Sequence, residues 1–210
     1  MASNAAAARG DVADTRAAVI EAAIDTILEQ GYYRASSNEI ARRAGVTWGV
    51  IQHHFGTREN LVLAALEHVV AAQTSYLAAA TVQGDTLVAR LESYGAILWD
   101  YYATEPFLAH LQIIVNLGHD PTTAQGTIDA MDSALRRNVA AMTRLLADAV
   151  APMKLRPDDR ELVFALLRGV ALDHLVLATL HPSMVSATRR QRLLRAASEA
   201  VAEYLSRRRR

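Results

Sequence analysis

Hydrophobic residues recur every three or four positions along most of this 210-residue chain, the spacing that places side chains on one face of an α-helix. No stretch keeps the alternation of hydrophobic and polar residues that marks a half-buried β-strand. The pattern therefore predicts an all-α protein. The predicted helices span residues 14–30, 37–44, 48–55, 58–80, 86–103, 106–117, 123–150, 158–180 and 183–206.

Two of these helices are short and lie close together in the sequence. Ser36 and Glu39 have the spacing of a capping box, in which a hydroxyl and a carboxylate each accept a hydrogen bond from a free backbone N–H at a helix start. Gly45 falls where helices commonly end, because glycine adopts the left-handed conformation at little cost. Thr47 can cap the second helix, residues 48–55, so the segment predicts a helix-turn-helix.

The second short helix has two different faces. At 100° per residue, one arc holds Trp48, Gly49, Gln52 and His53, and the other holds Val50, Ile51, His54 and Phe55. The second arc can pack into a core, while the first can enter the major groove of DNA, which is wide enough for an α-helix. Gly49 has no side chain, so the helix backbone can approach DNA closely.

The segment from Gly31 to Leu61, GYYRASSNEIARRAGVTWGVIQHHFGTRENL, resembles the DNA-binding segment of the TetR family of bacterial transcriptional regulators. The matching positions are Ile40-Ala41, Ala44-Gly45-Val46, Gly49, His54-Phe55, Arg58 and Leu61, in order and without gaps. Two positions depart from the family, because Gln52 replaces the usual tyrosine and Arg58 replaces the usual lysine. The resemblance implies that both contact the DNA backbone. Glutamine can donate to phosphate or bind adenine through two hydrogen bonds.

The resemblance also implies a domain organisation. Residues 14–57 are expected to form a three-helix DNA-binding head and residues 58–206 a helical body for ligand binding and dimerisation. A flexible N-terminal arm, residues 1–13, precedes them, and a solvated basic tail, residues 207–210, follows. The helix that begins at Arg58 would link head to body and act as the lever between them, and the last two helices would form the homodimer interface. The residues expected to contact DNA are Ser36, Ser37, Asn38, Arg43, Thr47, Trp48, Gly49, Gln52, His53 and Arg58.

The charge of the chain is unevenly distributed. Its formal net charge is zero, with 22 basic and 22 acidic residues. Between residues 31 and 58, however, four arginines, at positions 34, 42, 43 and 58, stand against Glu39 alone. This local excess is typical of a DNA-binding module, although a solvated basic surface has the same composition.

Composition narrows the remaining possibilities. The chain has no cysteine, which excludes disulfides and cysteine nucleophiles and fits a reducing cytoplasm. Its first residues lack the apolar run of a secretory signal, and no segment offers 18 uninterrupted apolar residues. The helix at residues 158–180 is apolar nearly all round, which predicts burial on more than one side, but Arg168, Asp173 and His174 interrupt it. We therefore expect a soluble cytoplasmic protein.

Aromatic and polar residues on the body helices are candidates for a ligand pocket, because small-molecule pockets combine apolar walls with a few polar groups. The candidates are Trp99, Tyr102, Phe107, His110, Asn116, Phe164, Arg168 and His174. Arg168 is the most informative of them, because a charge on a buried helix requires a partner. Asp173 or a carboxylate of the dimer partner would fill that role, and an anionic ligand is the other interpretation.

No cofactor or metal is expected. The side chains of His53 and His54 point about 100° apart on a helix and do not converge on one ion. The other histidines lack the i, i+4 spacing of a helical zinc site. The sequence contains no glycine-rich phosphate loop and no Gly-x-Ser-x-Gly motif, so it does not indicate an enzyme.

The sequence thus predicts a homodimeric repressor that binds a palindromic double-stranded DNA operator and is released from it by a small-molecule inducer. Two alternatives stay open. One is an interaction protein that keeps the fold without operator binding, in line with Gln52 and the neutral net charge. The other is a small-molecule enzyme that uses the pocket of the body.

Overall fold

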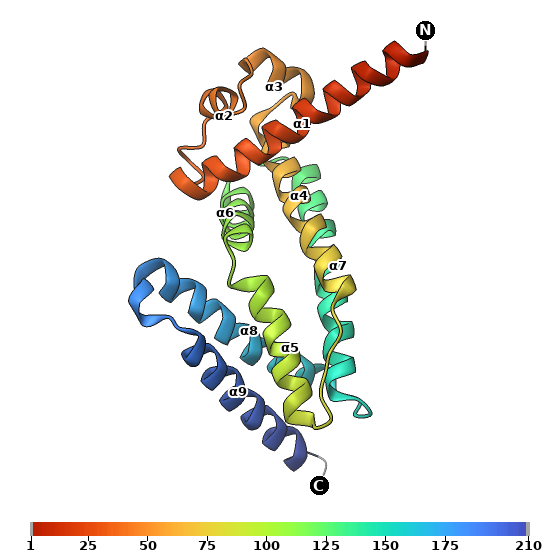
Figure 1. Cartoon of the computed structure of the whole chain (residues 1–210), viewed down its shortest axis with the longest axis vertical. Helices are drawn as coiled ribbons and strands as arrows, with labels where there is room; N and C mark the ends of the chain where they lie inside the picture. The colour runs from red at the N-terminus through yellow and green to blue at the C-terminus, as the bar shows by residue number, and fades with distance from the viewer. Residues whose placement is uncertain (1, 209–210) are drawn as a thin grey trace. The chain divides into compact units, whose positions relative to one another are not determined.

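The structure is a computed structural model that describes the backbone of residues 2–208 and the side chains of residues 12–208. Within residues 2–208 the chain forms helices and no strand (Figure 1), so the all-α prediction is confirmed. The elements are α1 (Ala2–Gln30), α2 (Ser37–Arg43), α3 (Trp48–Phe55), α4 (Arg58–Ala79), α5 (Leu87–Tyr102), α6 (Glu105–His119), α7 (Gln125–Val150), α8 (Pro157–Leu180), the 3-10 helix η1 (Pro182–Met184) and α9 (Ala187–Arg207).

The two ends of the chain differ from the sequence-based expectation. Helix α1 begins at Ala2 rather than at residue 14, so most of the expected arm is helical. Residues 5–8 are four consecutive alanines, the best helix formers, which explains the longer helix. The last helix begins at Ala187 rather than at residue 183, because η1 precedes it and Ser186 caps it. Met1, Arg209 and Arg210 lie outside the described residues.

Contacts divide the chain into two compact units. Unit 1 comprises residues 1–72 and 108–135. In it α1 packs against α2, and α2 against α3. These helices share one hydrophobic core with the first part of α4, with α6 and with the beginning of α7. Its fully buried members include Ile27, Ile40, Ile51, Leu61, Leu66 and Ile113.

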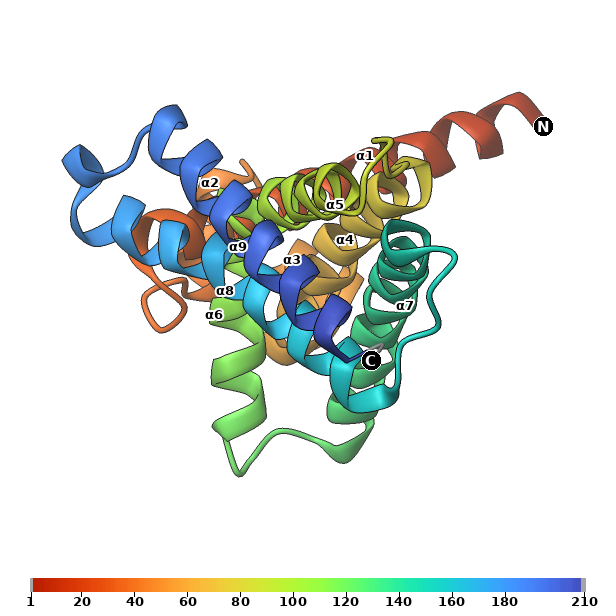
Figure 2. The same cartoon turned by 90° about the horizontal axis from the view of Figure 1, so that it is seen from below.

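Unit 2 comprises residues 73–107 and 136–210. Helices α5, α8 and α9 pack against one another in it (Figure 2). Helix α5 approaches α9 closely at Gly95, where an added Cβ would lie 3.0 Å from Leu194 Cδ2. Tyr204 of α9 donates a hydrogen bond to Asp159 of α8 at 2.7 Å, which ties the C-terminal helix to the start of α8.

These units do not follow the expected boundary between head and body at residue 57. Helices α4, α6 and α7 each contribute residues to both units. Ile113, Leu117 and Met131, which follow that boundary by more than fifty residues, lie in the core of unit 1. Three short helices bury too little apolar surface to be stable alone, so the head completes its core with α6 and α7.

His110 gives unit 1 a pH-dependent stability. Its side chain is 2% exposed, and burial lowers its pKa from 6.5 to about 4. The unfolded chain therefore binds a proton at this residue between pH 6.5 and pH 4, while the folded chain does not. The stability that neutral His110 contributes to the folded state is fully present above pH 6.5 and is lost as the pH falls towards 4.

We expect the free energy of unfolding to fall by about 3 kcal/mol across that window. His110→Leu should flatten the slope in urea titrations at several pH values, whereas His181→Gln, at an exposed position, should leave it unchanged. The Glu39 carboxyl, whose pKa is lowered to about 2, changes the free energy of unfolding in a separate and more acidic pH range. An unchanged slope in His110→Leu would show that another group controls the transition.

Candidate nucleic-acid interface

The helix-turn-helix has the predicted backbone. Ser36 caps α2, and its hydroxyl accepts a hydrogen bond from the Glu39 N–H at 3.3 Å. Gly45 lies in the turn with φ of +68°, the left-handed conformation expected of it. The other half of the predicted capping box is wrong, because the Glu39 carboxylate accepts its hydrogen bonds from Arg42, Arg43 and Gln30.

Glu39 is the centre of an ion-pair cluster on α2. Its Oε1 lies 2.7 Å from Arg42 Nη2 and 2.9 Å from Arg43 Nε. Arg43 also pairs with Glu29 of α1 at 2.6 Å. Hydrogen bonds from Arg42 and Arg43 lower the pKa of the Glu39 carboxyl to about 2. The positive excess of the segment is therefore smaller than its sequence indicates, because Glu29 joins it from the preceding helix.

Helix α3 has one buried face and one exposed face. Ile51 and Phe55 are buried in the core of unit 1, and Gly49, Gln52 and His53 are exposed. Thr47 has the extended backbone of a cap, but its side chain makes no capping hydrogen bond.

Other residues chosen for DNA contact also lie at the surface of unit 1. Ser36 and Asn38 are exposed and Ser37 is half-buried. Trp48, placed on the exposed arc from the sequence, is half-buried and packs against the core. The polar surface available to DNA is therefore narrower than predicted.

Arg58, the first residue of α4, holds the loop before α2. Its Nη2 donates to the Tyr32 carbonyl at 2.6 Å, and its Nε donates to the Ala35 carbonyl at 3.2 Å. Its guanidinium also lies 4.5 Å from the centre of the Tyr32 ring. The Tyr32 N–H in turn donates to Gln112 Oε1 of α6 at 3.1 Å. Arg58 thus fixes the backbone that leads into the cap of α2, and phosphate contact by this residue stays a prediction.

Comparison with known proteins agrees with this geometry. Residues 19–65 match the family described as "Bacterial regulatory proteins, tetR family". The HTH-type transcriptional repressor Rv3405c of Mycobacterium tuberculosis is 33% identical over 85 residues, which cover 40% of this chain and 45% of that protein. The matched segment thus spans less than half of this curated relative.

Residues 19–65 of the chain belong to the TetR family.

Solved structures of TetR-family proteins share the whole fold. A TetR-family regulator from Mesorhizobium loti superposes with a TM-score of 0.69 at 19% identity, covering 92% of this chain and 97% of that one. The regulator FadR from Bacillus subtilis, solved in complex with stearoyl-CoA, gives a TM-score of 0.61 at 16% identity, covering 88% and 96%. At these identities the similarity establishes the fold alone.

The residues chosen from the sequence for a ligand pocket do not form one site. Trp99 of α5 is 5% exposed and stacks on His174 of α8, with ring centres 4.3 Å apart. Arg190 of α9 lies 5.2 Å from the Trp99 ring centre and pairs with Asp100 at 2.8 Å. This group joins α5, α8 and α9 to one another.

Four other candidates belong to core packing or to helix surfaces. Tyr102 and Phe107 contact edge to face, with ring centres 4.7 Å apart, and the Tyr102 hydroxyl donates to Met142 Sδ at 3.4 Å. His110 is buried in unit 1, and Asn116 donates to the Gln112 carbonyl one turn earlier on the same helix.

Arg168 lacks the partner proposed for it. Asp173 pairs with Arg189 of α9 at 2.8 Å, so the assignment of Asp173 to Arg168 is wrong. The Arg168 guanidinium lies 4.7 Å from the Phe164 ring centre instead. It has no carboxylate within 4.0 Å among residues 12–208. Asp173 and Arg168 are five residues apart on α8, which turns their side chains to different faces.

Phe164 lines a cavity of about 350 Å³ together with Tyr94 and Arg160, two residues that the sequence patterns did not single out. Tyr94 occupies a core position in the apolar stripe of α5, and such a tyrosine looks like plain core until its hydroxyl is located. Arg160 lies in the first turns of α8, where an arginine is an ordinary surface residue.

We expect Arg58→Ala to lower the free energy of unfolding by about 1–2 kcal/mol, because two carbonyls lose a charged donor. Arg58→Lys keeps the charge but cannot reach both carbonyls with a planar fork, so it should lose most of the same stability. Urea unfolding measures both, with Arg34→Lys as the exposed control. Full stability in Arg58→Lys would show that charge alone, and not the two-carbonyl contact, matters here.

Proposed function

We propose that this TetR-family chain is a cytoplasmic, homodimeric repressor that inserts α3 of each protomer into the major groove of operator DNA and leaves the DNA when a small molecule binds unit 2. The observation that carries the proposal is the exposed face of α3 at Gly49, Gln52 and His53, supported on its other face by a complete core. A rigid helix with a free polar face is the arrangement that reads base edges.

Gly49 supports DNA contact independently. A Cβ at this position would meet Thr47 Oγ1 at 3.6 Å, an ordinary contact distance. Packing within the chain therefore does not require glycine, and glycine inside a helix costs about 1 kcal/mol relative to alanine. Close approach of the α3 backbone to a phosphate or a base edge accounts for this cost.

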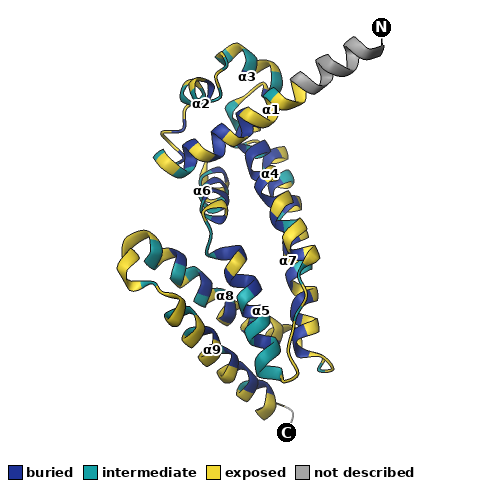
Figure 3. Cartoon of the chain, in the orientation of Figure 1, coloured by how far each residue is buried: buried dark blue, intermediate teal, exposed yellow. Residues whose placement is uncertain are grey.

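The proposed dimer uses α8. In one protomer this helix exposes a stripe that contains Leu162, Leu166, Gly169, Val176 and Leu180, with the charged Asp173 between Gly169 and Val176. Figure 3 colours the exposed residues of the chain yellow. Helices α4 and α8 are long and apolar enough to cross a membrane by length and composition alone. The charged Arg168 and Asp173 within α8 favour a protein partner over lipid. A second copy of α8 and α9 would bury the stripe.

Control of operator binding by a ligand follows from the thermodynamic linkage of the two binding equilibria. FadR, similar in fold, was solved with stearoyl-CoA bound. If a ligand of unit 2 favours a head position that does not fit the operator, DNA and ligand lower each other's affinity by the same factor. Binding equilibria alone produce this regulation, so it requires no catalytic step. Operator affinity that no ligand of unit 2 changes would leave only constitutive DNA binding.

DNA binding can be tested by fluorescence anisotropy with duplexes from the DNA that flanks the gene, with a scrambled duplex as competitor. We expect selective binding that weakens steeply with salt, because phosphate contacts release counterions. Gln52→Ala should reduce selective affinity by about 1–2 kcal/mol, the scale of one base or phosphate contact. Gln191→Ala on α9, also exposed, is the matched control.

Equal affinity for flanking, scrambled and genome-selected duplexes would contradict operator recognition and favour the interaction-protein alternative. Loss of selectivity in Gln191→Ala as large as that in Gln52→Ala would show that the effect does not arise at α3.

The dimer prediction compares two variants with the same exposure. Leu166 on α8 and Val115 on α6 are each 47% exposed. Leu166→Glu should shift the protein from dimer to monomer in sedimentation velocity, because it would bury a charge in an apolar interface. Val115→Glu should leave the dimer intact. A dimer that persists in Leu166→Glu at micromolar concentration would exclude this face as the interface.

A further inference from the structure

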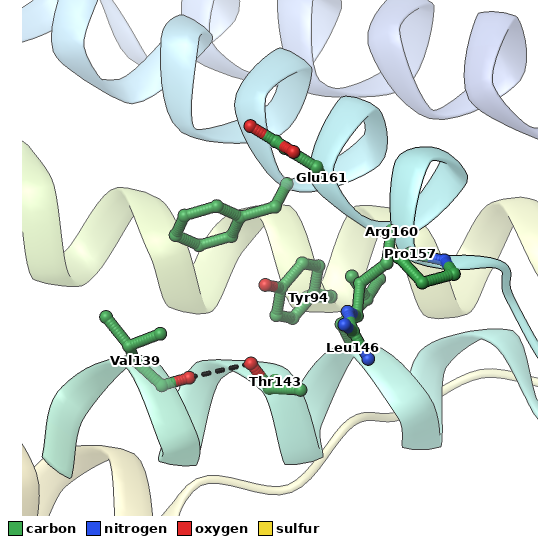
Figure 4. Close-up of a pocket in the computed structure, with 8 residues that line it drawn as sticks. Tyr94, Val139, Thr143, Leu146, Pro157, Arg160 and Glu161 are labelled. Atoms are coloured by element: carbon green, nitrogen blue, oxygen red, sulfur yellow. Dashed lines mark hydrogen bonds between the residues drawn. The ribbon is translucent and has the colours of Figure 1, made fainter. Parts of the chain in front are cut away.

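Unit 2 contains a cavity of about 350 Å³ among α5, α7 and α8 (Figure 4). The residues that line it are Tyr94, Val139, Thr143, Leu146, Pro157, Arg160, Glu161 and Phe164. Its volume lies in the range of small-molecule sites, and its walls are mostly aliphatic or aromatic. The apolar walls suit a ligand with a hydrocarbon body.

Tyr94 supplies an unused hydrogen bond to this cavity. Its side chain is 0% exposed, and its hydroxyl has no hydrogen-bond partner among the described residues. In Figure 4 the hydroxyl points into the space between α7 and α8. Burial raises the pKa of the Tyr94 hydroxyl, so this group keeps its proton and can donate it to an acceptor. Leaving such a group without a partner is costly, and a ligand acceptor would satisfy it.

A positive charge also lines this cavity, at Arg160. The side chain of Arg160 extends across the cavity to Leu146 of α7, while the carboxylate of Glu161 turns away (Figure 4). Among residues 12–208, Arg160 has no carboxylate within 4.0 Å. A second cavity of about 240 Å³ shares Thr143, Leu146 and Arg160 with the first and is also lined by Lys154, the one lysine of the chain.

The Thr143 hydroxyl offers no free donor to a ligand in the cavity. The Thr143 hydroxyl donates to the Val139 carbonyl at 2.8 Å, which leaves it only as an acceptor. The free donors of the site are thus the Tyr94 hydroxyl and the Arg160 guanidinium. An anion with two oxygens can accept from both, and a carboxylate has this form.

We propose that this cavity binds a small monocarboxylic acid with an apolar body, whose carboxylate accepts hydrogen bonds from Tyr94 and Arg160. The apolar body lies against Val139, Leu146 and Phe164. This inference rests on the proposed function for its regulatory meaning, since the acid would be the inducer. The binding itself requires no DNA.

Isothermal titration calorimetry of the full-length dimer without DNA tests the site, with octanoate and 4-phenylbutyrate as probes. Octanamide and octylammonium, which keep the chain and remove or reverse the charge, are the ligand controls. We expect both acids to bind at one site per protomer and the two controls to bind at least about ten-fold more weakly, because they lose the charge-assisted hydrogen bond.

Two variants assign the contacts. Tyr94→Phe should weaken the acids about ten-fold and raise the Tm of the unliganded protein, because it removes a buried hydroxyl without a partner. A purely structural tyrosine would not change stability and affinity in opposite directions. Arg160→Met keeps an unbranched apolar stem but removes the charge, and it should weaken the acids ten-fold or more, while Arg34→Gln, which removes the same charge from unit 1, should leave their affinity unchanged.

The proposal is overturned if neither acid binds, if octanamide or octylammonium binds as tightly as octanoate, or if Arg160→Met and Tyr94→Phe bind the acids like the parent protein. Adding octanoate to the anisotropy assay then separates the two proposals. Acid binding without operator binding would refute the regulator and keep the site. Operator binding without acid binding would refute the carboxylate site and keep the regulator.

Discussion

The contact of Arg58 with the carbonyls of Tyr32 and Ala35 is the constraint on which the helix-turn-helix depends. Ala35 immediately precedes Ser36, the cap of α2, so this contact fixes where α2 begins and therefore where α3 lies. A guanidinium can reach two carbonyls with two parallel donors, which an ammonium cannot do in the same geometry. The replacement of the family's usual lysine by Arg58 fits this task.

The sequence was sufficient for the local structure of this head. Gly45 requires a left-handed conformation, Ser36 caps α2, and the apolar positions of α3 point into the core, since all three depend only on neighbours within a few residues. The partners of Arg58 and Glu39 could not be predicted in the same way. Arg58 binds residues 23 and 26 positions earlier, and Glu39 shares Arg43 with Glu29, so tertiary packing decides both.

Of the ligand candidates, Phe164 lines the cavity around Tyr94, whereas several others pack elsewhere for a related reason. Periodicity places aromatic residues on the inner face of a helix but does not say which of them meet. Trp99 faces His174 and Tyr102 faces Phe107, and both pairs close on each other instead of on an open space. The cavity formed instead around Tyr94, whose hydroxyl is distinguished only by a missing partner. No residue pattern records such an absence.

Helix α8 is apolar nearly all round, but only one of its sides is covered by the helices of its own unit. Four of its apolar residues are buried in unit 2, where α8 packs against α5 and α9, namely Val163, Leu167, Ala171 and Leu175. The stripe through Leu166 and Val176 stays exposed on another side. One side is covered within the chain and the other is the face proposed for the dimer, and two such sides would account for the uniform hydrophobicity that the sequence shows.

Helix α7 is the element that can join the proposed cavity to the head. It is continuous from Gln125 to Val150, and it contributes Val139 and Leu146 to the cavity and Met131 to the core of unit 1. The N–H of Ala124, just before α7, donates to Glu59 Oε1 at 3.2 Å, and Glu59 follows Arg58 on α4.

A displacement of α7 would thus reach the residue beside the Arg58 contact through one helix and one hydrogen bond, without first bending α4. The resemblance to the family points to α4 as the lever. The three helices that line the cavity are α5, α7 and α8, and of these α7 alone has residues in both units. Coupling between sites requires such a physically continuous element whose position both sites can bias.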